Sequence, residues 1–419
     1  MQIKTFLPVF LLISNVLFAQ ESWFNEDVVR NASIQKAFAY IDSNLPAQID
    51  EWIKITEISS PSKQEVNRAN YIEAEMKKAG LEVTRDDFNN VIGVLKGNGT
   101  GPTVAFAAHM DTVFPIDTPI KVRREGDTLY APGIGDDSAS DANMLSAIRA
   151  IKASNLQFKG DVIFIGTVQE EIGLKGMRHY LEANRDKVKM LVALDGSLDG
   201  VYYGALGIYW YKFIYSGPGG HTLFSRGKPN PNKAVARAIL DIAAIPLPDE
   251  KSPSVAYCNI GMIGGGKIYN AISQESFFTV DLRTTDPVVL RDLDQKIRAT
   301  AEGAAKQEGV QFRIEMANET AAGGTEVQLA DRRKHPIVQT GVDVDNYLIK
   351  QKFPDKKVEA IPSGSTDGNI GVEMGIPTIA VGRTFGRGQH TLEESADIGG
   401  IDIGTKQIVL LAAFLAGLQ

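Results

Sequence analysis

The stretch Val104-Ala105-Phe106-Ala107-Ala108-His109-Met110-Asp111 organises this chain. Its apolar run has the length of a buried β-strand and ends on a histidine, with an aspartate two residues later. In open α/β sheets, ligands bind outside the edge at which parallel strands end. We therefore predict that His109 is the first ligand of a metal site and that later segments supply the other ligands.

The composition is that of a globular protein. The chain has 419 residues, 43% hydrophobic and 23% charged, with a formal net charge of −7. This length predicts two domains. No run of lysine and arginine interleaved with aromatic residues occurs, which argues against nucleic acid as a partner. Cys258 is the one cysteine, so an intrachain disulfide and a cysteine-rich zinc cluster are both excluded.

Residues 1–19 have the pattern of a secretory signal peptide. Lys4 gives a positive amino-terminal region, Phe6 to Phe18 is mostly apolar, and Ala19 suits the position before a cleavage site. The alternative is a membrane anchor, but the apolar stretch is short for a helix that spans a bilayer. We expect an exported protein, periplasmic or secreted, with no stable membrane anchor.

Two further buried strands are also followed by acidic residues. Residues 162–168 lead into Glu170-Glu171, and residues 190–194 lead into Asp195. Asp136 and Asp137 come just before a predicted helix over 140–154, where helix N-capping is the alternative role for both. Because three strand ends carry ligand-type side chains, we predict that they share one site.

The rest of the pattern predicts a larger domain interrupted by a smaller one. Residues 27–58 and 62–79 are predicted helices, the first broken at Pro46. Between 207 and 318 the order of predicted elements is β-α-β-β-α-β, which is ferredoxin-like. A helix over 336–350, a strand over 378–381 and a helix over 403–418 return the chain to the larger domain. The predicted segments are 20–206 and 319–419 for the larger domain and 207–318 for the insertion.

Convergence of these segments would create a strongly acidic site. Its candidate members are His109, Asp111, Asp136, Glu170, Glu171, Asp195 and His390. Carboxylates so close together need positive charge to remain ionised, and few lysines or arginines lie in these segments. Divalent cations would supply it, since imidazole and carboxylate ligands suit zinc, cobalt or manganese. One carboxylate that bridges two ions, beside an uncoordinated glutamate as general base, is a co-catalytic arrangement.

The same motifs carry a family resemblance. His109-Met110-Asp111-Thr112-Val113 resembles the H-x-D-T-V signature of the M20 family of metallopeptidases and amidohydrolases. Segments similar to the family's other motifs follow in the family's order: Gly133 to Asp137, Glu170-Glu171, Asp195-Gly196, Gly219-Gly220-His221, Asn270, Asp281-Leu282-Arg283, Ser365 to Gly368 and His390 to Glu394. The ordered set is specific, whereas each motif alone is weak. The resemblance implies an α/β zinc-peptidase catalytic domain with a mixed sheet and helices on both faces, plus an inserted ferredoxin-like dimerisation or lid domain.

The resemblance also implies a role for each ligand in a site for two divalent metal ions, with zinc favoured and cobalt or manganese as alternatives. Asp136 would bridge both ions, His109 and Asp195 would complete one site, and Glu171 and His390 would complete the other. The peptide bond that follows Asp136 would be cis.

Further implied roles concern catalysis and substrate binding. Glu170 would activate the bridging water, and Asp111 would orient the metal-bound histidine. His221 would reach the oxyanion of the tetrahedral intermediate across a homodimer interface; the alternative is an ordinary turn histidine. Asn270 and Arg283 would bind the carboxylate or backbone of the substrate, although Arg283 could equally form a salt bridge with the nearby Asp281.

One motif departs from the family pattern. The family usually has Asp-x-Lys-x-Gly where this chain has Asp136-Asp137-Ser138-Ala139-Ser140, so a positive charge near the site is missing. The loop 382–388, with Arg383 and Arg387, either shapes the substrate pocket or only connects two elements.

These observations predict an exported exopeptidase for dipeptides or tripeptides, with aminopeptidase activity favoured by a resemblance to peptidase T. An N-acyl-amino-acid deacylase of the same family is the alternative. A non-catalytic peptide-binding protein is a third hypothesis, which the general base Glu170 argues against.

Overall fold

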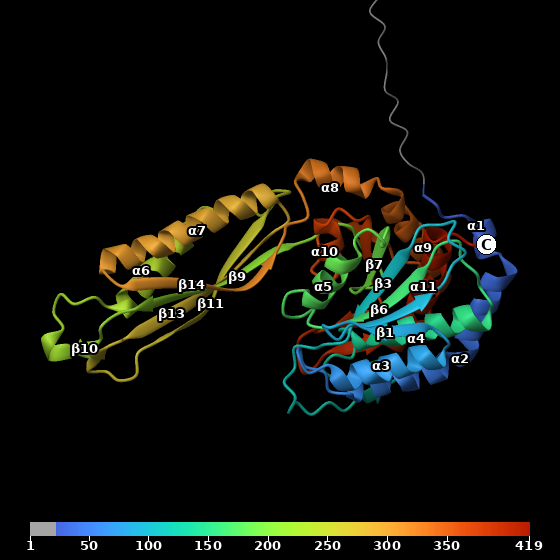
Figure 1. Ribbon diagram of the computed structural model, residues 1–419, viewed down its shortest axis with the longest axis horizontal. Helices are drawn as coiled ribbons and strands as arrows, with labels where there is room; N and C mark the ends of the chain where they lie inside the picture. The colour runs from blue at the N-terminus through green and yellow to red at the C-terminus, as the bar shows by residue number, and fades with distance from the viewer. Residues whose placement is uncertain (1–21) are drawn as a thin grey trace, which may run out of the picture.

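The computed structural model describes residues 22–419, so the predicted signal peptide lies outside the described residues. The described chain forms two bodies (Figure 1). The larger is an α/β body around an eight-stranded sheet, and the smaller is an elongated body around a four-stranded sheet.

The larger sheet is mixed, with strand order β1-β2-β6-β3-β7-β16-β8-β15. Its four central strands, β6, β3, β7 and β16, are parallel, whereas β1, β2 and β6 pair antiparallel, as do β16 and β8. The bounds are β1 Glu82–Arg85, β2 Val91–Leu95, β3 Val104–His109, β6 Val162–Thr167, β7 Met190–Leu194, β8 Gly200–Tyr202, β15 Glu359–Ile361 and β16 Thr378–Val381. The apolar run that ends at His109 is therefore a central strand, β3, of this sheet.

Helices cover both faces of this sheet, as predicted. Val104 and Phe106 of β3 join the core formed with α2, α3, α4, α9 and α11, while Ala105 and Ala107 join the core formed with α5 and α10. Because alternate residues of β3 face different helix layers, the whole strand is apolar. The helices are α2 Ala32–Glu57, α3 Val66–Lys78, α4 Ser138–Ala153, α5 Lys175–Asn184, α9 Pro336–Lys352, α10 Gly368–Glu373 and α11 Ile401–Leu415, with the short α1 Glu26–Val29 and α8 Glu326–Arg333.

Two helix predictions are corrected. The predicted break at Pro46 is wrong, since α2 continues through it. Pro46 lies on the exposed face of α2, where water can satisfy the carbonyl that loses its helical partner. The predicted helix over 62–79 begins only at Val66, because Lys63 adopts a left-handed backbone conformation with φ of 73°.

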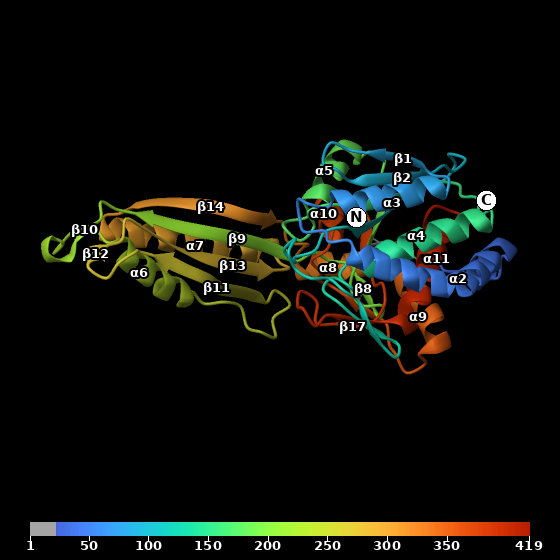
Figure 2. The same cartoon turned by 90° about the horizontal axis from the view of Figure 1, so that it is seen from below.

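The smaller body has the predicted ferredoxin-like order. The strands and helices are β9 Gly207–Ser216, α6 Pro231–Ala243, β11 Ala256–Gly265, β13 Glu275–Thr284, α7 Pro287–Glu308 and β14 Gln311–Thr320. The sheet order is β11-β13-β9-β14, with antiparallel neighbours throughout. Both helices pack on one face, against Tyr211, Phe213 and Tyr215 of β9 (Figure 1). A small pair, β10 Gly220–His221 and β12 Ala271–Ile272, lies at the end furthest from the larger body (Figure 2).

Two further features frame the site. A four-stranded sheet of order β17-β18-β5-β4 holds the loop 388–394 between two of its strands; the bounds are β4 Arg123–Glu125, β5 Thr128–Tyr130, β17 Gly386–Arg387 and β18 Ser395–Asp397. The segment Ile398–Leu415, which contains α11, is long and apolar enough to cross a membrane, but 83% of it is buried in the protein. It packs against α2, α4 and α9 as a core helix.

Candidate metal centre

The predicted ligands are positioned by the carboxyl ends of parallel strands. His109 is the last residue of β3 and lies opposite Thr167, the last residue of β6, while Ala107 pairs with Ala193 of β7. The strands therefore end at one edge of the sheet, and the residues that follow them meet there. The peptide bond between Asp136 and Asp137 is cis, as the family resemblance implied.

The ligand atoms form two groups that share Asp136. One ligand atom each of Asp136, Glu171 and His390 lies within 4.8 Å of the others, and the same holds for His109, Asp136, Asp137 and Asp195. The two oxygens of Asp136 point to different groups. Its Oδ1 lies 3.1 Å from His109 Nε2, and its Oδ2 lies 3.3 Å from His390 Nε2. This geometry allows one carboxylate to join two metal sites.

His390 is held by two carboxylates. Its Nε2 lies 3.2 Å from Glu171 Oε2 and 3.3 Å from Asp136 Oδ2, and these contacts raise the pKa of His390 to about 10. Although burial opposes ionisation, Arg383, His109 and His390 hold the pKa of Asp136 well below its usual range. The carboxylates of Asp136 and Glu171 therefore stabilise positive charge on the His390 ring.

Asp111 positions more of the site than the sequence predicted. Its buried carboxylate accepts hydrogen bonds from the backbone N–H groups of Glu170 (2.9 Å) and Glu171 (3.2 Å) and from the hydroxyl of Ser62 (2.6 Å). The His109 Nδ1 lies 3.1 Å from the Asp111 carbonyl oxygen and 3.6 Å from its carboxylate. Asp111 thus orients the glutamate pair through its carboxylate and His109 mainly through its backbone.

Glu170 has the environment of a general base. It is buried beside His109 and Glu171, with ligand-type atoms of the three within 4.8 Å of one another. Burial raises the pKa of the Glu170 carboxyl well above its usual range, and the carboxylates of Glu171, Asp195 and Asp367 raise it further, against the opposing effect of His109. A raised pKa suits a carboxylate that must take up and release a proton near neutral pH.

The shortage of positive charge expected from the sequence is not found. Arg383 is 4% exposed, and its guanidinium contacts Asp136 Oδ1 at 3.3 Å, Asp137 Oδ1 at 3.1 Å and the carboxylate of Asp195. Burial alone would lower the pKa of Arg383, but these three carboxylates raise it above its usual value. Arg383 therefore neither shapes an open pocket nor merely connects two elements; it supplies charge inside the cluster.

Two more acidic residues stabilise the loop that carries Asp136. Glu394 accepts hydrogen bonds from the N–H groups of Gly133 (2.9 Å), Gly135 (2.8 Å) and Asp136 (2.8 Å), and burial raises its pKa to about 7. Asp137 precedes α4, but its side chain makes no capping hydrogen bond. It accepts instead from the His109 N–H at 3.0 Å, so the helix-capping alternative is wrong for Asp137.

A cavity of about 330 Å³ opens in front of the ligands. The inserted body forms one wall of it with Ile208, Trp210, Arg283, Asn318 and Thr320, and His109, Asp136, Glu170, Glu171, Asp195 and His390 form another. Arg283 forms the ion pair offered as its alternative role, because its Nε lies 3.0 Å from each carboxylate oxygen of Asp281. It also lines the cavity, and its role in substrate binding stays a prediction.

Two predicted site residues lie elsewhere in this chain. His221 and Asn270 are neighbours at the far end of the inserted body, where the N–H of Thr222 donates to the Asn270 carbonyl at 3.0 Å. Neither lines the cavity in front of the predicted ligands. Within one chain, the structure therefore brings together every predicted metal ligand but separates these two residues from them.

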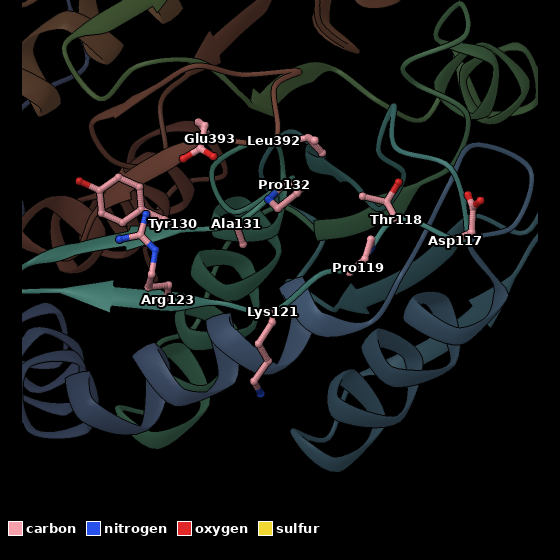
Figure 3. Close-up of a pocket in the computed structure, with 10 residues that line it drawn as sticks. All are labelled: Asp117, Thr118, Pro119, Lys121, Arg123, Tyr130, Ala131, Pro132, Leu392 and Glu393. Atoms are coloured by element: carbon pink, nitrogen blue, oxygen red, sulfur yellow. The ribbon is translucent and has the colours of Figure 1, made fainter.

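A second pocket, of about 500 Å³, lies beside the loop that follows His390 (Figure 3). It is lined by Asp117, Thr118, Pro119, Lys121, Arg123, Tyr130, Ala131, Pro132, Leu392 and Glu393. It shares none of these residues with the metal cavity. The carboxylate cluster therefore opens toward the inserted body and not into this pocket.

Several curated proteins are similar in sequence. The uncharacterised protein YqjE of Bacillus subtilis is 26% identical over 348 residues, 79% of this chain and 88% of that protein. Carboxypeptidase G2 of Pseudomonas is 25% identical over 225 residues, and succinyl-diaminopimelate desuccinylase of Rickettsia typhi is 25% identical over 239 residues. These two matches cover 51% and 50% of this chain, and 53% and 62% of the length of the respective relatives.

Solved structures share the fold. Aminopeptidase PepT from Bacillus cereus matches with a TM-score of 0.68 at 23% identity, over 89% of this chain and 99% of that one. YXEP of Bacillus subtilis, described as a dinuclear metal-binding peptidase from the M20 family, matches with a TM-score of 0.63 at 18% identity, over 90% and 99% of the two chains. At these identities the matches show a common fold.

The sequence model described as "Peptidase family M20/M25/M40" matches residues 105–348, more than half of the chain, and this segment holds all but the first residue of β3 and every predicted ligand except His390. The chain therefore belongs to peptidase family M20/M25/M40 and is a metallohydrolase.

Proposed function

We propose that this protein is an exported exopeptidase that hydrolyses short peptides with two divalent metal ions. The observation that carries the proposal is the position of Asp136 between two ligand groups, with the buried Glu170 next to both. The described structure of YXEP as a dinuclear metal-binding peptidase supports the two-ion arrangement.

The donor set fits two such ions. His109, Asp136 and Asp195 would hold one, and Asp136, Glu171 and His390 would hold the other. Glu171 Oε1 is buried and has no hydrogen-bond partner among the described residues, so it is free to bind a cation. Imidazole and carboxylate ligands favour zinc, with cobalt or manganese as alternatives. When bound, the ions would polarise the scissile carbonyl and lower the pKa of the attacking water.

The chain's own side chains perform the proton transfer. Glu170 takes a proton from the attacking water and returns it to the leaving amine, which its raised pKa favours. Asp111 holds the backbone of Glu170 and Glu171 and so fixes the base relative to the ligands. A cavity of about 330 Å³ limits the substrate to a short peptide, and Arg283 on its wall can bind a substrate carboxylate.

A homodimer would complete the site. His221 and Asn270 lie next to large exposed apolar side chains, namely Leu223, Phe224, Ile268 and Tyr269, and edge strand β11 exposes Tyr257, Met262 and Ile263. Exposed apolar residues on an unpaired strand edge favour association. A second copy bound there could deliver His221 to the cavity of its partner, where it would stabilise the oxyanion.

The alternative is an N-acyl-amino-acid deacylase, which the similarity to a desuccinylase favours. Both substrate classes have a free carboxylate for Arg283, but only the peptide has a free amine. Metal-depleted protein should therefore be reloaded with zinc, cobalt or manganese and assayed on dipeptides, tripeptides and N-acyl amino acids. Hydrolysis of peptides only when the amine is free supports an aminopeptidase, hydrolysis of acylated substrates alone supports the deacylase, and no metal-dependent hydrolysis refutes both.

Export and dimerisation need separate tests. Mass spectrometry of the chain expressed in full should show cleavage after Ala19 if residues 1–19 are a signal peptide. Light scattering should give twice the mass of the chain, and His221→Ala should lower turnover without a change in metal content. A monomer with unchanged activity would contradict the dimeric site.

A further inference from the structure

The wall of the metal cavity formed by the inserted body is made of two rows of side chains across three strands. Arg283 of β13 pairs with Ile208 of β9, which pairs with Thr320 of β14. One step further out, Asp281 pairs with Trp210, which pairs with Asn318. Apart from Asp281, all of these residues line the cavity.

A β-bulge in β14 determines which of its residues face the cavity. Met316 pairs with Tyr211 and Asn318 with Trp210, so Ala317 is an extra residue without a partner of its own. In a regular strand, Ala317 would lie opposite Trp210, and Glu319 would lie opposite Ile208 in the row of Arg283. Because a shift of one residue exchanges the two faces of a strand, the bulge turns Asn318 and Thr320 toward the cavity and Glu319 away from it.

Of the two polar groups of the Asn318 side chain, only the oxygen makes a hydrogen bond to the described residues. Its Oδ1 accepts a hydrogen bond from the Thr320 hydroxyl at 3.1 Å. The same oxygen lies against Gly173, at which an added Cβ would come within 2.7 Å of it; Gly173 also has φ of 113°, which favours glycine. Among residues 22–419 the Nδ2 amide group makes no hydrogen bond, and it remains available as a donor on the cavity wall.

Arg283 is arranged in a similar way. Its Nε is occupied by Asp281, and its two terminal amino groups make no hydrogen bond to the described residues. A guanidinium edge and a carboxamide N–H₂ on one sheet face are both pure donors, a combination that suits a planar anion. A glutamate at the position of Thr320 would instead repel that anion and compete for Arg283.

We propose that Asn318 is a specificity-determining residue that, with Arg283, binds the free α-carboxylate of the substrate. The inference rests on the proposed peptidase function and adds to it a second donor for the substrate carboxylate that Arg283 is expected to bind. Trp210, between the two donors, would pack against the apolar part of the same substrate residue.

The test compares Asn318→Asp and Asn318→Ala with the control Glu319→Gln, which changes a charged side chain on the same strand that is turned away from the cavity. Each protein is loaded with zinc, checked for metal content, and assayed on a dipeptide and on its carboxyl-terminal amide. We expect Asn318→Ala to raise KM for the free acid about ten-fold and Asn318→Asp to raise it about 100-fold or more, since a charged hydrogen bond is lost and, in the aspartate, a repulsion is added. KM for the amide, kcat and metal content should change little, and Glu319→Gln should resemble the wild type.

Equilibrium binding of the same dipeptide acid to zinc-loaded Glu170→Gln, with and without Asn318→Asp, separates this inference from the proposed function. A fall in affinity with Asn318→Asp supports the carboxylate site. Absence of hydrolysis in the activity assay would overturn only the peptidase proposal. Unchanged affinity, or a wild type that treats acid and amide alike, would overturn the inference and leave the peptidase proposal intact.

Discussion

The replacement of Arg383 by methionine tests how the carboxylate cluster is stabilised. Methionine is unbranched and can fill the space of the aliphatic part of the arginine. Among residues 22–419 it removes the guanidinium that contacts Asp136, Asp137 and Asp195. Removal of one partner from a buried ion pair costs about 3–5 kcal/mol, because it leaves uncompensated buried charge. We expect the free energy of unfolding of the metal-free protein to fall by about this amount at pH 8.

Metal should compensate for the loss. Divalent cations neutralise the same carboxylates, so the variant should bind zinc more tightly and gain more stability from it than the wild type does. A ligand at 100 times its dissociation constant adds about 2.7 kcal/mol to the folded state, which is large enough to resolve in a denaturant titration. The difference between variant and wild type should therefore shrink when zinc is added.

The assay is urea unfolding with chelator and with zinc. Arg387→Met is the matched control, because Arg387 lies four residues further along the chain, in β17, and is exposed. A loss in metal-free Arg383→Met of less than about 1 kcal/mol would show that the arginine does not stabilise the cluster. A loss that zinc leaves unchanged would show that the metal ions and Arg383 do not neutralise the same carboxylates.

Three further predictions concern neighbouring carboxyl groups. Glu170→Gln should lower kcat by about 10²–10⁴-fold at unchanged metal content, measured on zinc-loaded protein, and retained turnover would remove Glu170 from the mechanism. Asp111→Asn should weaken zinc binding by about 10–100-fold in a competition with a chelating dye, because its N–H₂ would face the N–H donors of the glutamate pair; equal affinity would contradict this role. Burial raises the pKa of Asp141 from 3.8 to about 7, so its contribution to stability is lost as pH rises through this range, and Asp141→Asn should gain about 2–3 kcal/mol relative to wild type between pH 5 and pH 8 in urea unfolding. A pH-independent difference would show that Asp141 titrates normally.

The central strands could be predicted from sequence because burial on both faces leaves a simple signature. The predictions for β3 and β7 agree with the structure to the residue, since an uninterrupted apolar run is what two helix layers require. Pro46 shows the limit of local rules. Its effect on a helix depends on whether the freed carbonyl faces solvent, and this is decided by the packing of α2 on α4, which no local pattern contains.

The ligands themselves were visible in sequence because each follows a strand or a turn with a recognisable residue type. Arg383 was not, because Arg387 follows only four residues later, and nothing in the local sequence distinguishes the arginine that is buried among carboxylates from the one that is exposed. Burial of Arg383 is favourable only because its guanidinium contacts Asp136, Asp137 and Asp195, which belong to segments far away in the sequence. The role of Glu394 could not be predicted from local sequence either, since its partners Gly133 and Gly135 lie about 260 residues earlier in the chain.

Which side chains form the cavity wall opposite the ligands depends on the register of β14. Regular alternation along β14 would place Asn318 and Thr320 on the helix-covered face, with Met316, and Ala317 and Glu319 on the cavity face. One unpaired residue reverses that assignment after Met316, and the reversal replaces a carboxylate on the cavity wall by an amide and a hydroxyl. The metal site is thus set by residue identity at strand ends, whereas the substrate-facing wall is set by register. The register of β14 therefore decides which of its side chains a bound substrate would meet.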